Sequence, residues 1–281
     1  MRSALPNAQQ VLSNGVRTHS EFFIVTRGLE MQRCGFEPVR LDCRYAHSDR
    51  MTKPGKLIAI EGIDGSGKNT QVRLLQHELT SRGYSVFSTG FPQYESWFGK
   101  MVGQFLNGDL GPLDKVDPHF SALLYAGDRF EAKPRILDAL GAGSVVLADR
   151  YVASNLAHQT ARVPAEKRSQ FLTWIEHLEY EIYGLPREDL LLYLRVPPHE
   201  AQSLVKKKPS RPYTDSTHDI LEASIRHLED AADMYDSLSR QTPWATIQCF
   251  DATRGEMRLP EEISGDILSA VSPILTGLDR A

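Results

Sequence analysis

Residues 61–71 read EGIDGSGKNTQ and follow the short apolar run KLIAI, an order typical of a strand that leads into a phosphate-binding loop. The glycines let the backbone turn tightly so that N–H groups converge on an anion, and Lys68 adds a point charge for the outer phosphates. The strict pattern G-x-x-x-x-G-K-[ST] fails at one position, because Asn69 stands where a hydroxyl is expected and Thr70 follows one place late. A ligand-free turn is the alternative. The loop predicts a nucleotide site formed by Gly62, Ile63, Asp64, Gly65, Ser66, Gly67, Lys68, Asn69 and Thr70.

The missing hydroxyl at position 69 affects the expected binding of the metal ion and does not argue against binding of the nucleotide. In nucleotide loops the Ser or Thr commonly contacts Mg²⁺, which takes oxygen ligands and keeps several waters. The amide oxygen of Asn69, or a water that it holds, can substitute for that hydroxyl. A carboxylate is available at Asp149, which ends another apolar run. We therefore predict a Mg²⁺ site that involves Asp149 and Asn69.

Residues 145–159 read VVLADRYVASNLAHQ, so that Asp149 and Arg150 stand at the end of a predicted strand. Beside a phosphate loop, this carboxylate can hold Mg²⁺ or its water while the guanidinium binds a second phosphate. Taken alone, the two residues are equally typical of a surface ion pair at a strand end.

Upstream, residues 123–129 read LLYAGDR on a predicted helix. Tyr125 and Arg129 are four residues apart and therefore share one helix face. An aromatic ring there can stack on a base while the arginine reaches the polar edge of that base or a phosphate. A core tyrosine and a solvated arginine are the alternative.

Predicted strands and helices alternate along the chain and must position these groups. The strands are expected at Lys56–Glu61, Tyr84–Ser88, Ser144–Ala148, Leu190–Val196 and, as the last, Trp244–Phe250. The helices are expected at Asn69–Arg82, Pro118–Leu140 with a break or kink at Pro134, Phe171–Tyr183, Asp219–Leu238 and Glu261–Leu275. This order predicts an α/β fold with a parallel sheet, helices on both faces and ligands beyond the carboxyl ends of the strands.

Composition argues against two classes of partner. Hydrophobic residues make up 41% of the 281 residues and charged residues 24%, which is ordinary for a globular protein. The net charge of −4 gives no reason to expect a nucleic-acid partner, which favours a strongly basic face. No apolar run approaches the roughly 18 residues that a membrane-spanning helix needs, so we expect no membrane partner.

The three cysteines, Cys34, Cys43 and Cys249, lie far apart and lack metal-ligand spacing, which favours a reducing compartment, the cytoplasm. The first 50 residues contain seven arginines, no lysine and five acidic residues. A transit peptide would be poor in acids. We therefore interpret residues 1–50 as a poorly ordered extension or a start-site artefact, and residues 51–281 as the functional domain.

Over nearly all of residues 51–281, the sequence resembles the thymidylate kinase family. The matching pieces are EGIDGSGKNTQ, FPQY at residues 91–94, LLYAGDR, DRYVASNLAHQ and GLPREDLLLYLRVPP at residues 184–198. The resemblance implies a P-loop NTPase-type three-layer fold, with a five-stranded parallel sheet and a mobile lid. It also implies transfer of the γ-phosphoryl group of ATP to dTMP with Mg²⁺, which gives dTDP for dTTP synthesis, and a homodimer.

The family's motifs imply roles for individual residues of the acceptor site. Asp64 would contact the sugar of dTMP near its 3′-hydroxyl, Phe91 would shape the pocket with Pro92, and Tyr94 would lie at its sugar or phosphate side. Tyr125 would stack on thymine, and Arg129 would form hydrogen bonds to the edge of thymine. Arg150 would bind the acceptor phosphate. Asn155 and Gln159 would make polar contacts with the base.

Three positions depart from the family pattern. His158 stands where Tyr or Phe is usual, which leaves discrimination against a 2′-hydroxyl open, and Arg195 stands where Asp is common. Gly65 stands where some members carry an arginine. In the other subgroup the positive charge comes from the lid, which here corresponds to KKKPSR at residues 206–211, with Arg211 as the preferred residue. The resemblance thus gives a catalytic set of Lys68, Asp149, Arg150 and Arg211.

Asp219 and Glu222 resemble an acidic DxxE that follows the lid in the family. The segment after Phe250 is a reasonable place for adenine contacts. Two other functions stay open: a related kinase with another pyrimidine nucleotide as acceptor, and a nucleotide-binding module without transfer activity. Asn69 and Gly65 would mark the loss of activity in such a module, whereas retention of Lys68, Asp149, Arg150 and a charged lid argues against it.

Overall fold

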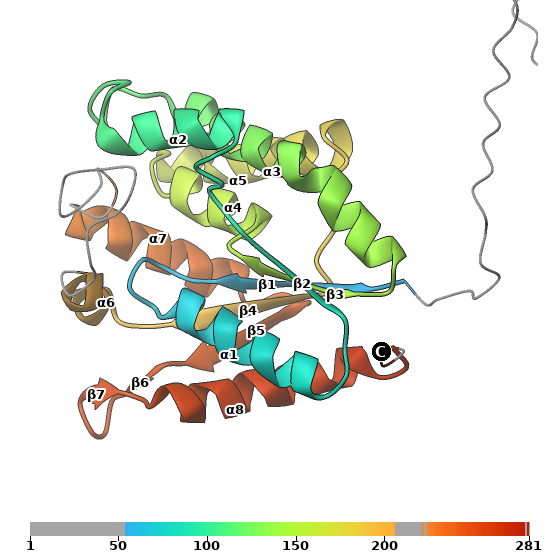
Figure 1. Ribbon diagram of the computed structural model, residues 1–281. Coiled ribbons are helices and arrows are strands. Elements are labelled where there is room, and N and C mark those ends of the chain that lie inside the picture. Colours follow the sequence, from blue (N-terminus) through green and yellow to red (C-terminus); the bar gives the residue numbers. More distant parts are fainter. Residues whose placement is uncertain (1–53, 206–220, 222–223, 279, 281) are drawn as a thin grey trace, which may run out of the picture. The chain divides into compact units, whose positions relative to one another are not determined.

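The computed structural model describes residues 54–205, 221, 224–278 and 280, and all other residues lie outside this description. A five-stranded sheet with the order β2-β3-β1-β4-β5 forms its centre, and all neighbouring strands are parallel (Figure 1). The strands are β1 (Lys56–Glu61), β2 (Val86–Gly90), β3 (Val145–Asp149), β4 (Leu190–Arg195) and β5 (Trp244–Gln248). The central strand β1 is apolar and almost completely buried, as expected for a strand covered on both faces.

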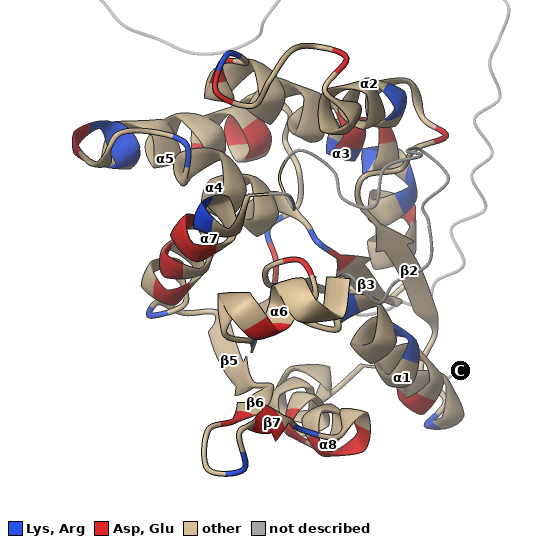
Figure 2. Cartoon of the chain, turned by 90° about the vertical axis from the view of Figure 1, so that its left-hand side faces the viewer, with Lys and Arg blue, Asp and Glu red and all other residues tan. Residues whose placement is uncertain are grey.

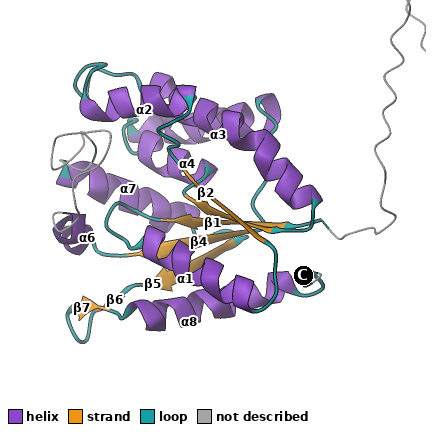
Figure 3. Ribbon diagram, viewed as in Figure 1, coloured by secondary structure: helices purple, strands orange, loops and turns teal. Residues whose placement is uncertain are grey.

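Helices cover both faces of the sheet and make three layers (Figure 3). On one face lie α1 (Lys68–Ser81) and α8 (Pro260–Val271), which is followed by η3 (Ser272–Leu275). The other face carries α3 (Pro118–Gly141), α4 (Val152–Thr160), η1 (Ala165–Lys167), α5 (Arg168–Glu176) and the π-helical η2 (His177–Ile182). α2 (Trp97–Asn107) packs on α3, and α7 (Ile225–Leu238) packs on both α4 and α6 (Pro198–Val205).

Alternation along β1 divides the core between the two faces. Ile58 and Ile60 pack in the cluster that includes α1 and α8, whereas Leu57 and Ala59 pack in the cluster that includes α3, α4 and α5. Successive strand residues point to opposite faces, so a continuous apolar run is the sequence pattern that a doubly covered strand requires. The α/β class and the five parallel strands predicted from the sequence are confirmed.

The strand register brings the motif residues to one edge. Ile60 of β1 pairs with Asp149 of β3, which pairs in turn with Gly90 of β2, and Glu61 pairs with Tyr193 of β4. The strands therefore end together, and the loops that follow them share the carboxyl edge of the sheet. Figure 2 looks toward this edge, where acidic and basic positions gather in the loops between α4, α6 and β3.

Several predicted elements differ from the structure. The helix predicted from Pro118 continues through Pro134 without a break, because burial of Ala132 and Ile136 against the sheet outweighs a local cost of about 3 kcal/mol. The alternative, a kink at Pro134, stays a prediction. The helix predicted up to Tyr183 changes to a π-helix after Glu176. Of the predicted helix Asp219–Leu238, the part from Ile225 is α7, whereas Asp219 and Glu222 lie outside the described residues.

The list of predicted helices lacks α2, α4 and α6. α2 begins with a Ser96 cap, whose Oγ accepts from the N–H of Gly99, and ends at Gly108 in a left-handed conformation. α6 begins at Pro198, two residues after the end of the predicted strand Leu190–Val196. Proline is favoured in the first turn of a helix, because its missing N–H would have no partner there.

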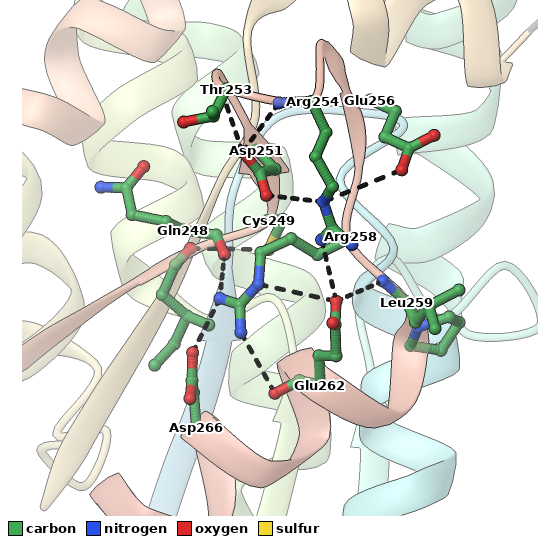
Figure 4. A network of polar contacts seen from close by, with 12 residues as sticks. Gln248, Cys249, Asp251, Thr253, Arg254, Glu256, Arg258, Leu259, Glu262 and Asp266 are labelled. Carbon is green, nitrogen blue, oxygen red and sulfur yellow. Dashed lines mark hydrogen bonds and ion pairs between the residues drawn. The ribbon is translucent and has the colours of Figure 1, made fainter.

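The strand predicted at Trp244–Phe250 is present as β5, but it is shorter than predicted and is not the last strand of the described residues. β5 ends at Gln248, and a small antiparallel hairpin of β6 (Phe250–Asp251) and β7 (Glu256–Met257) follows. Ion pairs fasten this hairpin to the start of α8 (Figure 4). Arg254 pairs with Asp251 at 2.6 Å and with Glu262 at 3.3 Å, and Arg258 pairs with Asp266 at 2.8 Å. The acids of α8 also lie near its positive N-terminal end.

No helix among the described residues is both long and apolar enough to cross a membrane. The division of the chain at residue 50 stays a prediction, because residues 1–53 lie outside the described residues.

Candidate active site

The loop between β1 and α1 has the backbone of an anion site. Gly62, Gly65 and Gly67 have φ values of 141°, 89° and 89°, in the region that favours glycine. α1 begins at Lys68, so its N-terminal N–H groups and positive end adjoin the loop. The Lys68 Nζ donates to the carbonyl oxygens of Gly62 and Ile63 at 2.9 Å each, and so lies along the loop.

Gly65 has no room for a side chain. A Cβ at this position would lie 2.1 Å from the backbone oxygen of Ala201 in α6, well inside contact distance. An arginine at this point of the loop is therefore incompatible with the packing of α6. This geometry agrees with the prediction that the catalytic positive charge comes from another segment.

A cavity opens beside the loop at the carboxyl edge of the sheet. All eight residues predicted to bind the acceptor nucleotide line it: Asp64, Phe91, Tyr94, Tyr125, Arg129, Arg150, Asn155 and Gln159. Pro92 and His158, which the sequence analysis discussed, line it too, and Leu106, Ser154 and Leu221 were missed. Segments far apart in the sequence thus form one site.

Arg150 joins the phosphate loop to the cavity. Its Nη2 donates to Asp64 Oδ1 at 2.7 Å, and its Nη1 donates to the Gly62 carbonyl and to Ser154 Oγ at 3.1 Å each. Its φ of 68° is unusual for a residue with a side chain. Burial disfavours the charged form, but Asp64 and other nearby groups outweigh burial and hold the pKa of Arg150 well above its ordinary value. The guanidinium is therefore a fixed positive charge.

Glu61, a buried acid that the sequence analysis missed, connects several elements at the carboxyl edge of the sheet. Glu61 accepts from the Tyr151 N–H at 2.7 Å, from Ser154 Oγ at 2.6 Å and from the Tyr235 hydroxyl at 2.8 Å. Burial raises its pKa. These contacts join β1, α4 and α7. The sequence did contain a signal for Glu61, because an acidic residue at the end of a fully buried strand is unusual and indicates a paired carboxylate.

A second missed acid shapes the cavity wall. Asp128, buried in α3, accepts from the Gln93 N–H at 2.9 Å and from Ser96 Oγ at 2.8 Å. Burial raises its pKa despite these hydrogen bonds. The carboxylate fastens the segment after Phe91 to α3, and so positions the start of the cavity.

Two buried amide side chains, those of Asn155 and Gln159, belong to the cavity lining. Asn155 Nδ2 donates to the Ala122 carbonyl at 3.0 Å and to Glu179 Oε1 at 2.8 Å. Gln159 Oε1 accepts from Ser121 Oγ at 2.7 Å and from Arg162 Nη1 at 2.8 Å. Oδ1 of Asn155 and the amide N–H groups of Gln159 therefore remain for the cavity. One is an acceptor and the other a donor.

Arg129 is not the solvated residue of the alternative interpretation. Its side chain is fully buried, and it forms a two-point ion pair with Glu179, with distances of 2.6 and 2.5 Å from Nε and Nη2. Such planar two-point pairing fixes the plane of the guanidinium. Arg129 still lines the cavity.

A chain of polar contacts through two histidines connects Arg150 to α7. Arg150 Nη1 lies 3.3 Å from His158 Nε2, and His158 Nδ1 lies 3.3 Å from His227 Nε2. A guanidinium can only donate, so His158 Nε2 accepts and its Nδ1 carries the proton. Burial, together with Arg150 and His227, holds the pKa of His158 well below its ordinary value. Burial lowers the pKa of His227 to about 4. Both rings are therefore neutral at pH 7.

The predicted magnesium ligands fit a hard cation. Asp149 ends β3 and is partly buried, and no hydrogen bond to its carboxylate is formed by the described residues. Asn69 lies exposed in the first turn of α1. Carboxylate and amide oxygens are ligands that Mg²⁺ accepts, with water completing its shell. No group of three or more His, Cys, Asp or Glu residues that could hold a metal ion occurs in the described part of the chain. Lys206–Arg211, the predicted lid, lies outside it.

Comparison with known proteins decides the family. A family model described as thymidylate kinase matches residues 60–255, which is more than half of the chain. The chain belongs to the thymidylate kinase family. It is therefore an ATP-dependent nucleoside monophosphate kinase, and the reaction of its family is the phosphorylation of dTMP.

Individual relatives agree with this assignment. Thymidylate kinase of Mycobacterium tuberculosis is 36% identical over 141 residues, which cover 50% of this chain and 65% of that protein. The probable thymidylate kinase of Pyrococcus horikoshii is 32% identical over 227 residues, which cover 80% of this chain and 99% of that protein. The structure of thymidylate kinase from Candida albicans superposes with a TM-score of 0.61 at 19% identity, over 79% of this chain and 92% of that one. The P-loop NTPase-type fold is thus confirmed.

The close approach of α6 to Gly65 leads to a first prediction. Gly65→Ala should lower kcat/KM for ATP by at least about tenfold, because the left-handed backbone costs about 1–3 kcal/mol and the methyl group meets a backbone oxygen. Steady-state kinetics with varied ATP measures this. Gly141→Ala is the matched control, since nothing lies within 4 Å of its Cβ position. An unchanged ATP dependence in Gly65→Ala would contradict the packing argument.

The buried histidines lead to a second prediction. The pKa of His227 is about 4 in the folded state and near 6.5 in the unfolded state, so the unfolded chain binds more protons between these values. The free energy of unfolding should fall as pH falls below about 6.5. His227→Gln should reduce the loss between pH 7 and pH 5 by about 2 kcal/mol.

Urea denaturation at both pH values measures this loss. His77→Gln, at an exposed position on α1, is the control and should leave the pH dependence unchanged. If His227→Gln loses as much stability as the wild type over this range, His227 is not buried in its neutral form.

Proposed function

We propose that the cavity is the dTMP site and that the loop from Gly62 to Thr70 binds the phosphates of ATP. The ion pair between Asp64 and Arg150 carries this proposal, because it joins a loop residue to a cavity residue at 2.7 Å. An acceptor phosphate at Arg150 would therefore lie beside the phosphates held by the loop. Nearness of this kind is what transfer between two phosphates requires.

The polar groups at the far end of the cavity support a thymine-type base. Thymine and uracil present an N–H between two carbonyl oxygens. Asn155 offers an acceptor for that N–H, and Gln159 and Arg129 offer donors for the carbonyl oxygens. Cytosine has an unprotonated ring nitrogen and an amino group in the corresponding places. We place the ring of Tyr125 against the face of the base, with Phe91 and Tyr94 at the remaining walls.

The chain supplies positioning and positive charge for the transfer. The acceptor phosphate oxygen is itself the nucleophile, so no general base is needed. Lys68 and the loop N–H groups would stabilise charge on the transferred phosphoryl group, and Arg150 would hold the acceptor. Arg211 stays our preferred source of further positive charge, as predicted from the sequence. Mg²⁺, held by Asp149 and Asn69, would neutralise charge on the phosphates when it is bound.

The acceptor could still be another pyrimidine nucleotide. His158 lines the cavity beside Arg150, where the family usually has an aromatic residue, so strictness toward 2′-hydroxyl groups depends on a different side chain here. The buried free thiol of Cys249 is compatible with a reducing compartment. We accordingly place the protein in the cytoplasm, where its product would supply dTTP for DNA synthesis.

An acceptor panel tests the proposed function. The full chain is assayed for ADP release with ATP, Mg²⁺ and dTMP, dUMP, UMP, dCMP or dGMP. We expect the highest kcat/KM with dTMP. Lys68→Ala and Arg150→Ala should each lower it by about 10²–10³-fold, because each removes a positive charge from the transfer site.

The exposed residues Lys100 and Arg187 give matched controls. Lys100→Ala and Arg187→Ala should keep the wild-type rate. A preference for another nucleotide would assign a different acceptor. ATP binding without turnover on any acceptor would instead identify a binding module.

We also propose that the protein forms a homodimer through α3. Four large apolar side chains are exposed along this helix, Phe120 (44%), Leu123 (37%), Phe130 (47%) and Leu137 (43%). Their spacing of three and seven residues places them on one stripe. An apolar stripe of this kind on a surface helix is typical of a protein–protein interface.

The dimer leads to a prediction about mass in solution. Leu123→Glu should shift the protein from dimer to monomer, because a charge in an apolar interface is costly. Light scattering after size-exclusion chromatography measures the mass. Leu259→Glu, which changes an exposed leucine at the start of α8, should remain dimeric. A wild type that is monomeric at micromolar concentration would remove the proposal.

A further inference from the structure

Glu179 lies behind the base end of the cavity without lining it. Its side chain is completely buried in the π-helical η2. Its carboxylate accepts from Arg129 at 2.6 and 2.5 Å and from Asn155 Nδ2 at 2.8 Å. Glu179 is thus the common partner of the two cavity residues that offer a donor and an acceptor to the base.

The carboxylate fixes which end of the Asn155 amide remains for the cavity. The Nδ2 group has two acceptors, Glu179 Oε1 and the carbonyl of Ala122. If the amide were reversed, its oxygen would face both of them, and three acceptors would meet without a proton between them. The observed orientation leaves Oδ1 buried without a partner among the described residues. An unpaired buried acceptor indicates a missing donor.

The same carboxylate fixes which edge of Arg129 remains. Nε and Nη2 are both used by Glu179, so Nη1 is the nitrogen left for a ligand. The guanidinium is planar, and pairing at two points sets the direction of the N–H groups on Nη1. Without the ion pair to Glu179, the guanidinium of Arg129 could rotate, and the direction of the N–H groups on Nη1 would not be fixed.

We propose that Glu179 is a positioning residue that gives the acceptor site its preference for a thymine-type base over cytosine. It does so without touching the nucleotide, by holding Asn155 as an acceptor and Arg129 as a donor. This inference rests on the proposed dTMP site. It adds a residue on η2, a segment that contributes nothing to the cavity lining.

The π-helical turn is a second observation at this residue. α5 gives way to η2 after Glu176, and Glu179 lies within the π-helical turns. Such turns are rare and occur frequently at functional sites. Here the segment carries the acid that the cavity wall requires. The local irregularity is therefore linked to the position of one carboxylate.

Glu179→Gln tests the inference, because it keeps the size of the side chain and removes one acceptor. An amide group in place of Oε1 would face both Arg129 Nη2 and Asn155 Nδ2, and in place of Oε2 it would face Arg129 Nε. Either orientation breaks the two-point pairing with Arg129, and the first also favours a reversed Asn155. We expect KM for dTMP to rise and the ratio of kcat/KM for dTMP to that for dCMP to fall by about 10- to 100-fold. The KM for ATP and the kcat at saturating dTMP should change by no more than a few fold.

Glu188→Gln is the matched control. Glu188 is also a buried carboxylate, and its Oε2 accepts from the Tyr180 hydroxyl at 2.7 Å without contact to a cavity residue. This variant should keep the wild-type ratio of dTMP to dCMP. Glu179→Asp retains the charge at a shorter reach, so its ratio should lie between those of the wild type and Glu179→Gln. Asn155→Ala should add little to the loss of selectivity in Glu179→Gln.

Different outcomes separate the two proposals. If the wild type does not phosphorylate dTMP, the proposed function fails. If the wild type prefers dTMP and Glu179→Gln loses activity equally with dTMP and dCMP, Glu179 has only a structural role and the inference is wrong. Should Glu179→Gln fail to fold, Glu179→Asp decides: an unchanged ratio overturns the inference, and a ratio reduced by a few fold supports it.

Discussion

The ion pair of Arg150 with Asp64 is the contact on which the arrangement of the site depends. Arg150 follows β3 directly, and its backbone N–H donates to the Ile60 carbonyl of β1 at 3.0 Å. The left-handed φ of 68° then turns the side chain toward the loop that follows β1. A strained residue persists only where its surroundings determine it. Here those surroundings are four hydrogen-bond partners drawn from the loop and α4.

Burial of charge at this edge is compensated locally. Glu61 lies beneath the site in an apolar sheet, and its carboxylate receives three hydrogen bonds from α4 and α7. An unpaired carboxylate in this position would be strongly destabilising. Because these partners come from elements distant in sequence, correct assembly of the helices and satisfaction of the charge are one event. Fold and site therefore stabilise each other.

The sequence predicted the parts of this protein that depend on local pattern. Apolar runs identified the five strands, and the cavity contains every residue predicted for the acceptor. It did not predict the supporting acids. Glu179 lies four residues after Ile175, on the apolar face of its helical stretch, where an acid is unusual. Its partner Arg129 lies 50 residues away, and nothing local indicates that the two meet. The ion pair between Glu179 and Arg129 forms only through tertiary contacts, so local sequence patterns do not predict it.

Opposite charges behind the two amides would give the cavity wall a fixed polarity toward a base in the proposed dTMP site. Amide side chains are symmetrical in shape, so an Asn or Gln alone offers no fixed polarity. Behind Gln159 stands the cation Arg162, which takes the carbonyl oxygen and leaves the N–H groups outward. Behind Asn155 stands the anion Glu179, which accepts one N–H of the amide while the Ala122 carbonyl accepts the other, so that only the oxygen remains unused by these contacts. The orientation of each amide in the cavity wall is therefore set by a charged residue behind it. At that depth water does not compete for the hydrogen bonds, and the charged side chain cannot move away.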